Sequence, residues 1–461
     1  MTGSPDTYDV AIIGAGVVGC AIARRVGRSH RTCLLIEARA DVGDVTSKAN
    51  TGILHSGFDA PHGSLESRLV RRGHELLSAY ASQTGIPVER IGALVVAWTG
   101  EQEAQLAGLL AKARGNGYDR AELITPAELY RREPHLALGA RGALRVPDES
   151  IICPWTTTLA FAEEAMSSGV ALRLNTELRG LARDGLHTIA TTRGEFRARW
   201  LVNAAGLGSD VIDRQLGHDD FTITPRRGQL VVFDKLSRHL VSSIVLPIPT
   251  GTTKGVLVAP TVYGNLLVGP TAEDLHDITD TSTTARGLRS LIAAAAAIVP
   301  ELAGEEVTSA YAGLRAATQR DDYQVHADLA QGYVCVGGIR STGLTASMAL
   351  AEHVAALLEQ LGCSMAERSH AAPGPHMPQL GDAFERPALS AAAVSGDPDY
   401  GRIVCFCERV SRGEIRDALS SAVPPQNLAG VARRTRATNG RCQGFYCAAE
   451  VAAMLRTGAP G

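Results

Sequence analysis

Four cysteines near the end of the chain have a spacing that could bind a metal centre. They form two close pairs, Cys405-Phe-Cys407 and Cys442-Gln-Gly-Phe-Tyr-Cys447, separated by the 34 residues from Glu408 to Arg441. Four thiolates can bind one [2Fe-2S] cluster. A structural four-cysteine zinc site or a pair of disulfides is the alternative, although paired zinc ligands more often have two-residue gaps.

A glycine-rich segment near the start has the spacing of a dinucleotide-binding loop. Gly14-x-Gly16-x-x-Gly19 lies between an expected strand, Tyr8 to Ile13, and an apolar helix to about Val26. Glycines there let the backbone approach a pyrophosphate at the helix N-terminus. Glu37 follows the next expected strand, Thr32 to Ile36, where its carboxylate can accept hydrogen bonds from ribose hydroxyls. The motif alone does not distinguish FAD from NAD, and a turn that only packs the helix on the strand is the alternative.

Four further segments, in their order along the chain, resemble the D-amino-acid-oxidase-like superfamily of flavoproteins. They are Thr51-Gly-Ile-Leu-His55-Ser-Gly57, Leu201-Val-Asn-Ala-Ala-Gly206, Tyr311-Ala-Gly-Leu-Arg315 and Gly337-Gly-Ile-Arg340-Ser-Thr-Gly343-Leu-Thr345. The resemblance covers residues 8 to about 360. Within it, Lys254 to Pro270 is similar to bacterial proteins called glycerol-3-phosphate dehydrogenase-like, and L-2-hydroxyglutarate oxidases are close relatives of these.

This resemblance implies FAD as a cofactor. In the superfamily the first glycine loop binds the FAD pyrophosphate, and the late glycine segment lies beside the flavin ring at the start of a helix. A helix N-terminus there would stabilise negative charge on the reduced ring. For Gly343 an ordinary helix-start turn is the alternative. The positions expected to bind the cofactor are Gly14, Gly16, Gly19, Glu37, Ala205, Gly206, Gly338, Gly343, Leu344 and Thr345.

Three residues of these segments are candidates for catalysis. Arg315 matches the arginine that superfamily members use to hold a substrate carboxylate or phosphate, and the guanidinium fork suits both anions. His55 lies in a loop that the family places near the flavin, where it could accept a proton. Arg340 stands beside the flavin loop and could contact the substrate or the ring. A structural role is the alternative for each. Further positive charge, favouring an anionic substrate, comes from Arg226, Arg227 and Lys254.

The cysteine pattern resembles the bacterioferritin-associated-ferredoxin-like domain, including Asn439-Gly-Arg-Cys442-Gln-Gly444 around the second pair. This resemblance implies a [2Fe-2S] cluster bound by all four cysteines. The stretch between the two pairs is expected to be rich in helices, with a capping box from Ser411 to Glu414. A cluster beside a flavin implies that electrons leave singly, to an external acceptor such as a quinone or a redox protein.

Apolar periodicity and turn residues predict the elements that must position these residues. Strands are expected at Ala93–Ala97, Val170–Leu174, Trp200–Asn203, Gln229–Phe233, Val256–Ala259 and Gly332–Gly338. Helices are expected at Leu65–Gln83, Gly100–Asn116, Pro126–Glu133, Ala285–Ile298 and Ala346–Leu361. Together they predict an α/β protein, with a Rossmann-type FAD-binding domain, an inserted antiparallel-sheet substrate domain and a small helical [2Fe-2S] domain.

The predicted boundaries divide the chain into an oxidoreductase, a linker and a cluster domain. Residues 1–363 form the FAD-dependent oxidoreductase, with the FAD-binding parts mainly at 8–60, 150–215 and 330–363 and the substrate-domain parts mainly at 61–149 and 216–329. Residues 364–400 are rich in Pro, Gly, Ala, Ser and His without a sustained period, which predicts a linker. Residues 401–461 form the [2Fe-2S]-binding domain.

Composition excludes several classes of protein. A net charge of -3 over 461 residues gives no basic surface overall, so nucleic acid is not an expected partner. The apolar stretch Val10–Ala23 is too short for a membrane span and follows no basic leader, which predicts a cytoplasmic protein without a signal peptide or transmembrane segment. Peripheral association with a membrane stays open. The other cysteines, Cys20, Cys33, Cys153, Cys335 and Cys363, are expected to be packing residues.

These observations predict an FAD-dependent dehydrogenase of a small anionic hydroxyl substrate, by resemblance glycerol 3-phosphate. Oxidation of a 2-hydroxy acid such as L-2-hydroxyglutarate, or of an amino acid, is a close alternative. A second alternative is an electron-transfer subunit whose substrate pocket belongs to a partner, as in multi-subunit dehydrogenases.

Overall fold

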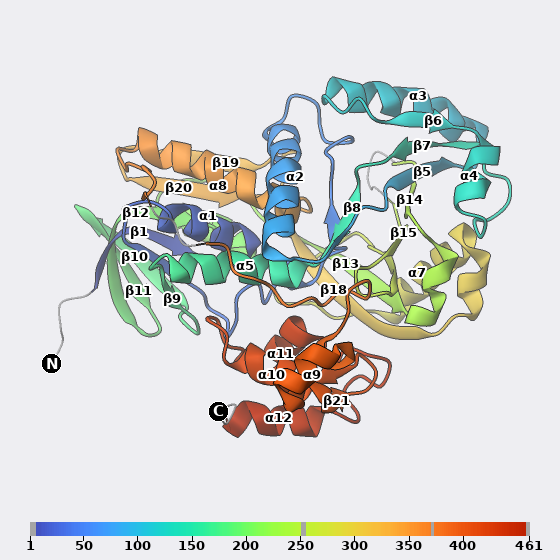
Figure 1. Cartoon of the computed structure of the whole chain (residues 1–461). Coiled ribbons are helices and arrows are strands. Elements are labelled where there is room, and N and C mark those ends of the chain that lie inside the picture. The colour runs from blue at the N-terminus through green and yellow to red at the C-terminus, as the bar shows by residue number, and fades with distance from the viewer. Residues whose placement is uncertain (1–5, 250–254, 370–372, 458–461) are drawn as a thin grey trace.

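The computed structural model describes residues 6–249, 255–369 and 373–457, which form two large sheets and a small C-terminal domain (Figure 1). In the first sheet β1 pairs in parallel with β2 and β12, and β12 pairs in parallel with β20. Its central strands are apolar runs because both faces are buried. The predicted Rossmann-type domain is confirmed. The strands of this sheet are β1 (Thr7–Ile13), β2 (Cys33–Ile36), β9 (Ala171–Arg173), β10 (Leu178–Asp184), β11 (Leu186–Thr191), β12 (Gly194–Asn203), β19 (Gln324–Asp328) and β20 (Tyr333–Gly337).

Four helices lie on one side of this sheet, three of them directly against it and one outside these. α1 packs between α5 and α8, and α2 packs outside against α8 (Figure 1). The contact between α2 and α8 is close, because a Cβ at Gly73 would lie 2.2 Å from the carbonyl oxygen of Thr345. α8 begins at Gly343, three residues before the predicted start, so the late glycine segment forms its first turn. These helices are α1 (Val17–Gly27), α2 (Leu65–Thr84), α5 (Pro154–Ser167) and α8 (Gly343–Gln360).

The second sheet has nine strands drawn from two separate stretches of the chain. The expected antiparallel sheet contains one parallel pair, since β14 runs parallel to β5 with Ile244 opposite Ala93. α7 (Ala285–Ile298) packs on this sheet, and α3 (Gly100–Gly115) and α4 (Pro126–Arg132) pack at its other end. The strands are β5 (Ala93–Ala97), β6 (Glu122–Ile124), β7 (Gly142–Val146), β13 (Thr224–Phe233), β14 (Ile244–Pro247), β15 (Leu257–Pro260), β16 (Leu266–Gly269), β17 (Glu273–Asp274) and β18 (Val307–Ala317).

A small third sheet joins the two large ones. β8 (Ser150–Ile152) pairs with both β3 (Ile53–Leu54) and β4 (Val88–Glu89), and all three strands are only two or three residues long. Strands this short show no periodicity that a sequence could reveal. They nevertheless bring the loop after β3 beside the residues just before β8.

The C-terminal domain lies against the oxidoreductase on the side of α5 and β18 (Figure 1). The capping box at Ser411 and Glu414 is confirmed, with both reciprocal hydrogen bonds present at the start of α10. The domain consists of β21 (Ile403–Cys405), β22 (Val410–Ser411), α10 (Arg412–Leu419), α11 (Leu428–Thr435) and α12 (Ala448–Thr457).

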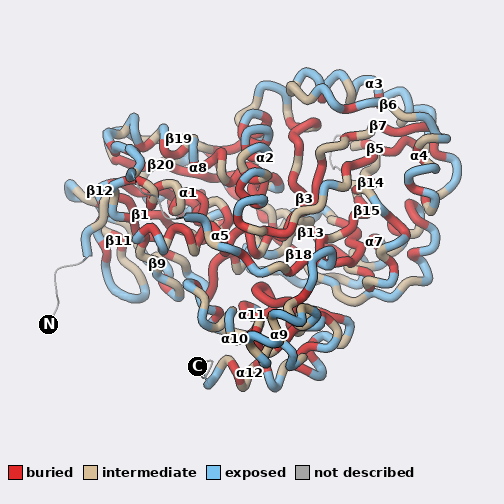
Figure 2. The backbone as a smooth tube through the Cα atoms, in the orientation of Figure 1, coloured by how far each residue is buried: buried red, intermediate tan, exposed pale blue. Residues whose placement is uncertain are grey.

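The segment predicted as a linker packs on the oxidoreductase rather than standing away from it. Met365, Met377 and Leu380 are buried, and the Met377 amide donates to the Thr84 carbonyl at 2.7 Å. The short helix α9 (Ala391–Gly396) follows. Figure 2 shows strands of the two sheets, such as β1 and β5, as largely buried, whereas most residues of this segment are intermediate or exposed. Its buried apolar residues are isolated and follow no helical or strand periodicity, because each packs into a separate gap on the oxidoreductase. The sequence of the segment alone therefore does not reveal that it packs there.

The helices in the part of the chain that the structure describes include none long and apolar enough to cross a membrane.

Candidate active site and cluster domain

Two positions of the loop between β1 and α1 accept only glycine. Gly14 has a φ of +101°, and a Cβ there would lie 2.6 Å from the carbonyl oxygen of Ala204. A Cβ at Gly19 would lie 1.8 Å from the carbonyl oxygen of Gly14. The loop is therefore pressed against the end of β12, where the expected cofactor residues Ala205 and Gly206 follow directly.

Glu37 closes the same site from the end of β2. Its carboxylate accepts hydrogen bonds from the amides of Ala15 and Arg39, each at 2.8 Å. Burial raises the pKa of Glu37, an effect that these two amides oppose. The carboxyl ends of β1, β2 and β12 thus meet at one edge of the sheet, which is where open α/β sheets bind dinucleotides.

In two helices, α1 and α8, the side chain of the N-cap residue makes no hydrogen bond to the first turn. α1 starts after Gly16, which has no side chain to offer, and its Val17 amide donates to the Ser47 hydroxyl at 2.9 Å. α8 starts after Thr342, whose hydroxyl instead donates to Glu66 at 2.7 Å. Open amides at the positive end of a helix bind anions. The donor set therefore fits a dinucleotide with a pyrophosphate near α1 and an anionic ring near α8.

His55 lies at the N-terminus of α8 and is held on both sides. Its backbone amide donates to the Thr345 hydroxyl at 3.0 Å, and its Nδ1 lies 3.1 Å from the buried carboxylate of Glu149. Glu149 also accepts from the amide and the hydroxyl of Ser56, at 2.6 and 2.8 Å. With Nδ1–H donating to Glu149, the neutral imidazole keeps its lone pair on Nε2. The arrangement suits a proton acceptor.

Glu149 could not be identified from the sequence as a partner of His55. The pair forms because Leu54 lies opposite Ser150 where β3 and β8 meet. The only signal was the acidic pair Asp148-Glu149 directly before a short apolar run.

Arg315 lies on β18 and is half-buried. Its Nη2 donates to the carbonyl of Thr271 at 2.6 Å, and among the described residues no carboxylate lies within ion-pair distance of it. Burial lowers the pKa of Arg315 to about 10, helped by the charge of Arg226, so the guanidinium stays cationic at neutral pH. The same strand contacts the segment before His55, because the Thr46 hydroxyl donates to Leu314 and the Tyr311 hydroxyl to Asn50, each at 2.8 Å.

The neighbouring arginines are already neutralised, contrary to the expectation that they attract substrate. Arg226, opposite Arg315 on β13, forms a bidentate pair with Asp274. Arg227 is buried between Glu273 and Asp280. Lys254 lies outside the described residues.

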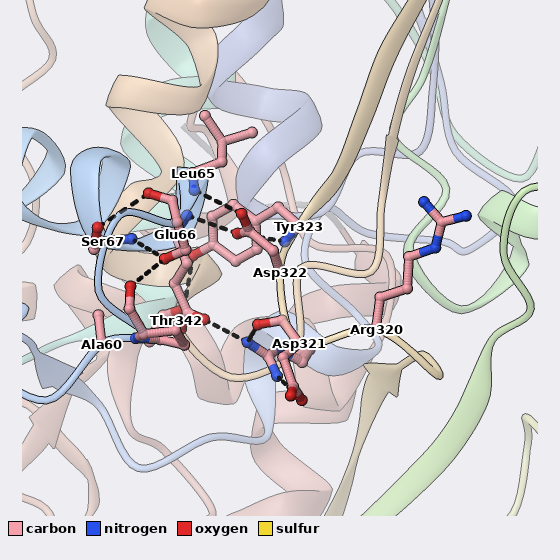
Figure 3. A network of polar contacts seen from close by, with 12 residues as sticks. Ala60, Leu65, Glu66, Ser67, Arg320, Asp321, Asp322, Tyr323 and Thr342 are labelled. Atoms are coloured by element: carbon pink, nitrogen blue, oxygen red, sulfur yellow. Dashed lines mark hydrogen bonds and ion pairs between the residues drawn. The ribbon is translucent and has the colours of Figure 1, made fainter.

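Arg340 belongs to a separate polar network beside α2. Its Nη2 lies 2.5 Å from Glu66, and it also donates to the carbonyl of Asp321. Figure 3 shows this network, in which Asp322 accepts from the amides of Leu65 and Glu66 at the start of α2. Arg340 has a φ of +51°, in the left-handed region that residues other than glycine rarely adopt, so its backbone is strained. The structure therefore does not bring Arg340 together with His55 or Arg315.

The four cysteines of the C-terminal domain meet as two pairs drawn from both ends of the domain. The thiol of Cys405 lies beside that of Cys447, and the thiol of Cys407 lies beside that of Cys442. Hydrogen bonds from the backbone amides of Tyr446, Gly444 and Phe445 lower the pKa of Cys442. Amides directed at sulfur stabilise thiolate and cluster sulfur, so the four residues fit a [2Fe-2S] cluster.

The loop that carries Cys442 needs a special backbone. Gln443 and Gly444 both have positive φ, at +48° and +85°. Gly440 is crowded by the first pair, since a Cβ there would lie 2.2 Å from the Cβ of Cys407. These constraints explain the glycines that surround the second cysteine pair in the sequence.

A buried ion-pair cluster fixes the C-terminal domain on the oxidoreductase. The carboxylate of Asp41 is 1% exposed and receives Arg433 at 2.7 Å and both terminal nitrogens of Arg434 at 2.8 Å. Burial raises the pKa of Asp41, but the hydrogen bonds and charges of the two arginines outweigh it, and the net pKa is lowered. The carboxylate is therefore ionised throughout the neutral range.

A second contact between the domains is aromatic. Arg436 of the C-terminal domain lies over the ring of Tyr263 at 4.2 Å, and Tyr263 stacks on Trp155 at 5.1 Å. The Trp155 indole donates to the carbonyl of Lys48 at 3.0 Å. This contact connects α11 to the same loop, residues 46–50, that approaches Arg315 and His55.

Comparison with known proteins gives two family matches. The family model described as FAD dependent oxidoreductase matches residues 9–357, and the model described as BFD-like [2Fe-2S] binding domain matches residues 403–457. Both matches agree with the sites described above.

Among relatives, the glycerol 3-phosphate dehydrogenase of Caloramator mitchellensis is 35% identical over 454 residues, which cover 97% of this chain and 94% of the relative. Human mitochondrial L-2-hydroxyglutarate dehydrogenase is 29% identical over 289 residues, covering 58% of this chain and 62% of the relative. The solved structure of L-alpha-glycerophosphate oxidase from Mycoplasma pneumoniae, with FAD bound, superposes with a TM-score of 0.76 at 27% identity and covers 81% of this chain and 99% of that one.

Asp41→Ala tests the docking of the C-terminal domain. Removing one partner of a buried ion pair leaves an uncompensated charge on Arg434 and costs about 3–5 kcal/mol. We expect the domain to come away from the oxidoreductase, measured as a separate calorimetric transition and as faster proteolysis within residues 383–400. Asp44→Ala is the matched control, because Asp44 pairs with Arg433 from a more exposed position. An Asp41→Ala protein that melts and resists protease like the control would contradict the role given to this carboxylate.

Proposed function

The chain belongs to the FAD dependent oxidoreductase family and carries FAD and a [2Fe-2S] cluster, and from this premise we propose that it is a dehydrogenase of glycerol 3-phosphate. The relative that covers 97% of the chain, and so extends through the cluster domain, supports this substrate above a 2-hydroxy acid or an amino acid. The alignment with human L-2-hydroxyglutarate dehydrogenase covers only 58% of the chain.

The single observation that carries the proposal is the half-buried guanidinium of Arg315, which lacks a carboxylate partner among the described residues. Partial removal of a cation from water is costly unless an anion compensates for it. A phosphate can accept two parallel hydrogen bonds from the guanidinium fork. Since Arg226 and Arg227 are already paired, Arg315 is the cation that remains for a substrate anion among the described residues of these strands, from which Lys254 is left out.

His55 and Glu149 supply the proton acceptor that oxidation of an alcohol requires. FAD, when bound, takes the hydride from the carbinol carbon, and the cluster takes electrons one at a time. The Nε2 lone pair of His55 accepts the hydroxyl proton, and the Glu149 carboxyl group at Nδ1 stabilises the imidazolium that results. Glu149 also fixes the ring orientation through Nδ1, so it acts as a positioning residue.

For Arg340 we propose a positioning role as well. Its pair with Glu66 ties the loop before α8 to the start of α2, and Glu66 also binds the Thr342 hydroxyl that would otherwise cap α8. The network thereby keeps the N-terminus of α8 open for an anionic ligand. The expected cofactor residues Gly338, Gly343, Leu344 and Thr345 lie in the segment that it holds.

Electrons leave, in this proposal, from the exposed side of the cluster domain to an external acceptor, a quinone or a redox protein. Phe406 lies between the two cysteines of the first pair, and Phe445 and Tyr446 lie between those of the second. Their side chains are 74%, 83% and 74% exposed, respectively. Large exposed apolar side chains mark contact surfaces. Such a surface suits contact with either a protein or a membrane. We further propose the cytoplasm as the compartment, where thiols such as the five buried cysteines outside the cluster domain stay reduced.

An anaerobic absorbance titration of the purified protein tests the proposed function. We expect glycerol 3-phosphate to bleach the flavin band and then the iron–sulfur absorbance, while L-2-hydroxyglutarate and amino acids leave both unchanged. Bleaching by L-2-hydroxyglutarate alone would replace the substrate. No bleaching by any of them would favour an electron-transfer subunit whose substrate pocket lies on a partner.

Arg315→Leu should raise KM for glycerol 3-phosphate by about 10- to 150-fold, because a hydrogen bond to a charged group contributes about 1.5–3 kcal/mol. Steady-state kinetics with an artificial acceptor would measure the change. Arg226→Leu is the matched control, since that arginine lies opposite on β13 but is paired with Asp274. Equal increases in both variants would show that general positive charge, rather than the fork of Arg315, attracts the substrate.

His55→Gln should lower kcat by about 10²- to 10⁴-fold, the usual contribution of a general base. Glu149→Gln should also lower kcat, because an amide nitrogen facing Nδ1 would force the proton onto Nε2 and remove the acceptor. His74→Gln is the control, since that imidazole contacts only the Asp148 carbonyl among the contacts found for it. If His55→Gln kept full kcat with an unchanged pH profile, another group would be the base.

A further inference from the structure

Three potential metal ligands converge on the face of the first sheet that is turned away from α1 and α8. Asp213 comes from α6 (Ser209–Gln215), His326 from β19 and Cys335 from β20, where His326 and Cys335 are directly opposite each other. One ligand atom from each residue lies within 4.8 Å of those of the other two. Asp213 is 1% exposed and Cys335 is fully buried. None of these residues belongs to the flavin or [2Fe-2S] sites.

Unsatisfied polar atoms gather at the same place. In the described residues seven buried side-chain nitrogen or oxygen atoms lack a hydrogen-bond partner, and three of them are Asp213 Oδ2, His326 Nε2 and His218 Nε2. Two of these atoms nevertheless face a carboxylate at ion-pair distance, since His326 Nε2 lies 3.2 Å from Asp213 Oδ1 and His218 Nε2 lies 3.2 Å from Asp328 Oδ2. Asp213 Oδ2 has no such contact, and a buried carboxylate oxygen without a partner is costly.

A plain hydrogen-bond network accounts for only part of this cluster. The Tyr333 hydroxyl donates to Asp213 Oδ1 at 2.9 Å, and the Asn203 amide group approaches the Cys335 sulfur at 3.7 Å. Neither contact reaches Asp213 Oδ2, and the His326 imidazole approaches only the other oxygen of the same carboxylate. The atoms that could bind an ion are one carboxylate oxygen, one imidazole nitrogen and one sulfur. Each has a lone pair, and the three lie close to one another.

We propose that Asp213, His326 and Cys335 bind a structural zinc ion. Zinc accepts carboxylate, imidazole and thiolate ligands in tetrahedral sites, and the mixed set excludes the hard cations that need oxygen alone. The fourth tetrahedral position is left for a water molecule, because His218 Nε2 faces Asp328 Oδ2 instead, at 3.2 Å. On binding, the Cys335 thiol loses its proton to solvent.

The ion would tie α6 to β19 and β20, two strands that already pair with each other through backbone hydrogen bonds. α6 follows β12, β19 is an edge strand, and β20 leads directly into the loop Gly338–Thr342 ahead of α8. A metal that fixes β20 therefore fixes the strand from which the late glycine segment departs. The proposal does not depend on the substrate, because it concerns the opposite face of the sheet.

Metal analysis of the purified holoenzyme, after incubation with one equivalent of zinc and gel filtration, tests the site. We expect about one zinc per chain in addition to the two irons of the cluster. Zinc K-edge absorption spectroscopy should show one sulfur at about 2.3 Å and nitrogen or oxygen ligands at about 2.0–2.2 Å. Iron and flavin do not contribute at this edge. Four sulfur ligands would mean that zinc had entered the [2Fe-2S] site, and would overturn the proposal.

Cys335→Ala should abolish zinc binding while FAD and iron content stay unchanged. Cys33→Ala is the matched control, because Cys33 is also a buried cysteine of the same sheet. Should Cys335→Ala fail to fold, Asp213→Asn retains the shape of the side chain and should lower zinc affinity about 10- to 100-fold or more. Retention of zinc at the parent level by either folded variant, or a parent protein that binds no zinc, would refute the site.

Discussion

The relative position of the two redox domains depends on one buried carboxylate, Asp41. It lies in the loop after β2, where the Gly43 amide donates to the carbonyl of Ala15 in the glycine loop at 2.8 Å. The same loop therefore shapes the dinucleotide site on one side and binds Arg433 and Arg434 on the other. Residues 401–461 contain nine arginines, no lysine and four acidic residues, although the whole chain is acidic. Arginine suits this interface because its fork engages a buried carboxylate with two nitrogens.

Local features of the sequence predict much of the cofactor chemistry. Gly14 and Gly19 are required by contacts within one strand–turn–helix unit, so their spacing reveals the loop before any tertiary structure is known. The cysteine pairs and the capping box at Ser411 are equally local. The Rossmann order follows from such units, and it was confirmed by the parallel pairing of β1, β2 and β12.

The remaining parts of the site depend on contacts that no local pattern encodes. Glu149 meets His55 across strands of two or three residues, and Glu66 meets Arg340 over 274 positions in the chain. The expected substrate charges of Arg226 and Arg227 are cancelled by acids on β17 and beyond, which the sequence alone could not pair with them. Cys335 was expected only to pack, because neither His326 nor Asp213 is near it in a metal-ligand spacing.

The domain contact built on Asp41, Arg436 and the Tyr263–Trp155 stack has a consequence for how the proposed reaction is timed. A carrier on a loose tether must search for its docking position before each transfer, and that search slows as the solvent thickens. Here the carrier is already docked, so the internal transfer depends on a fixed tunnelling distance. Solvent viscosity and crowding then act only on the encounters with substrate and with the external acceptor.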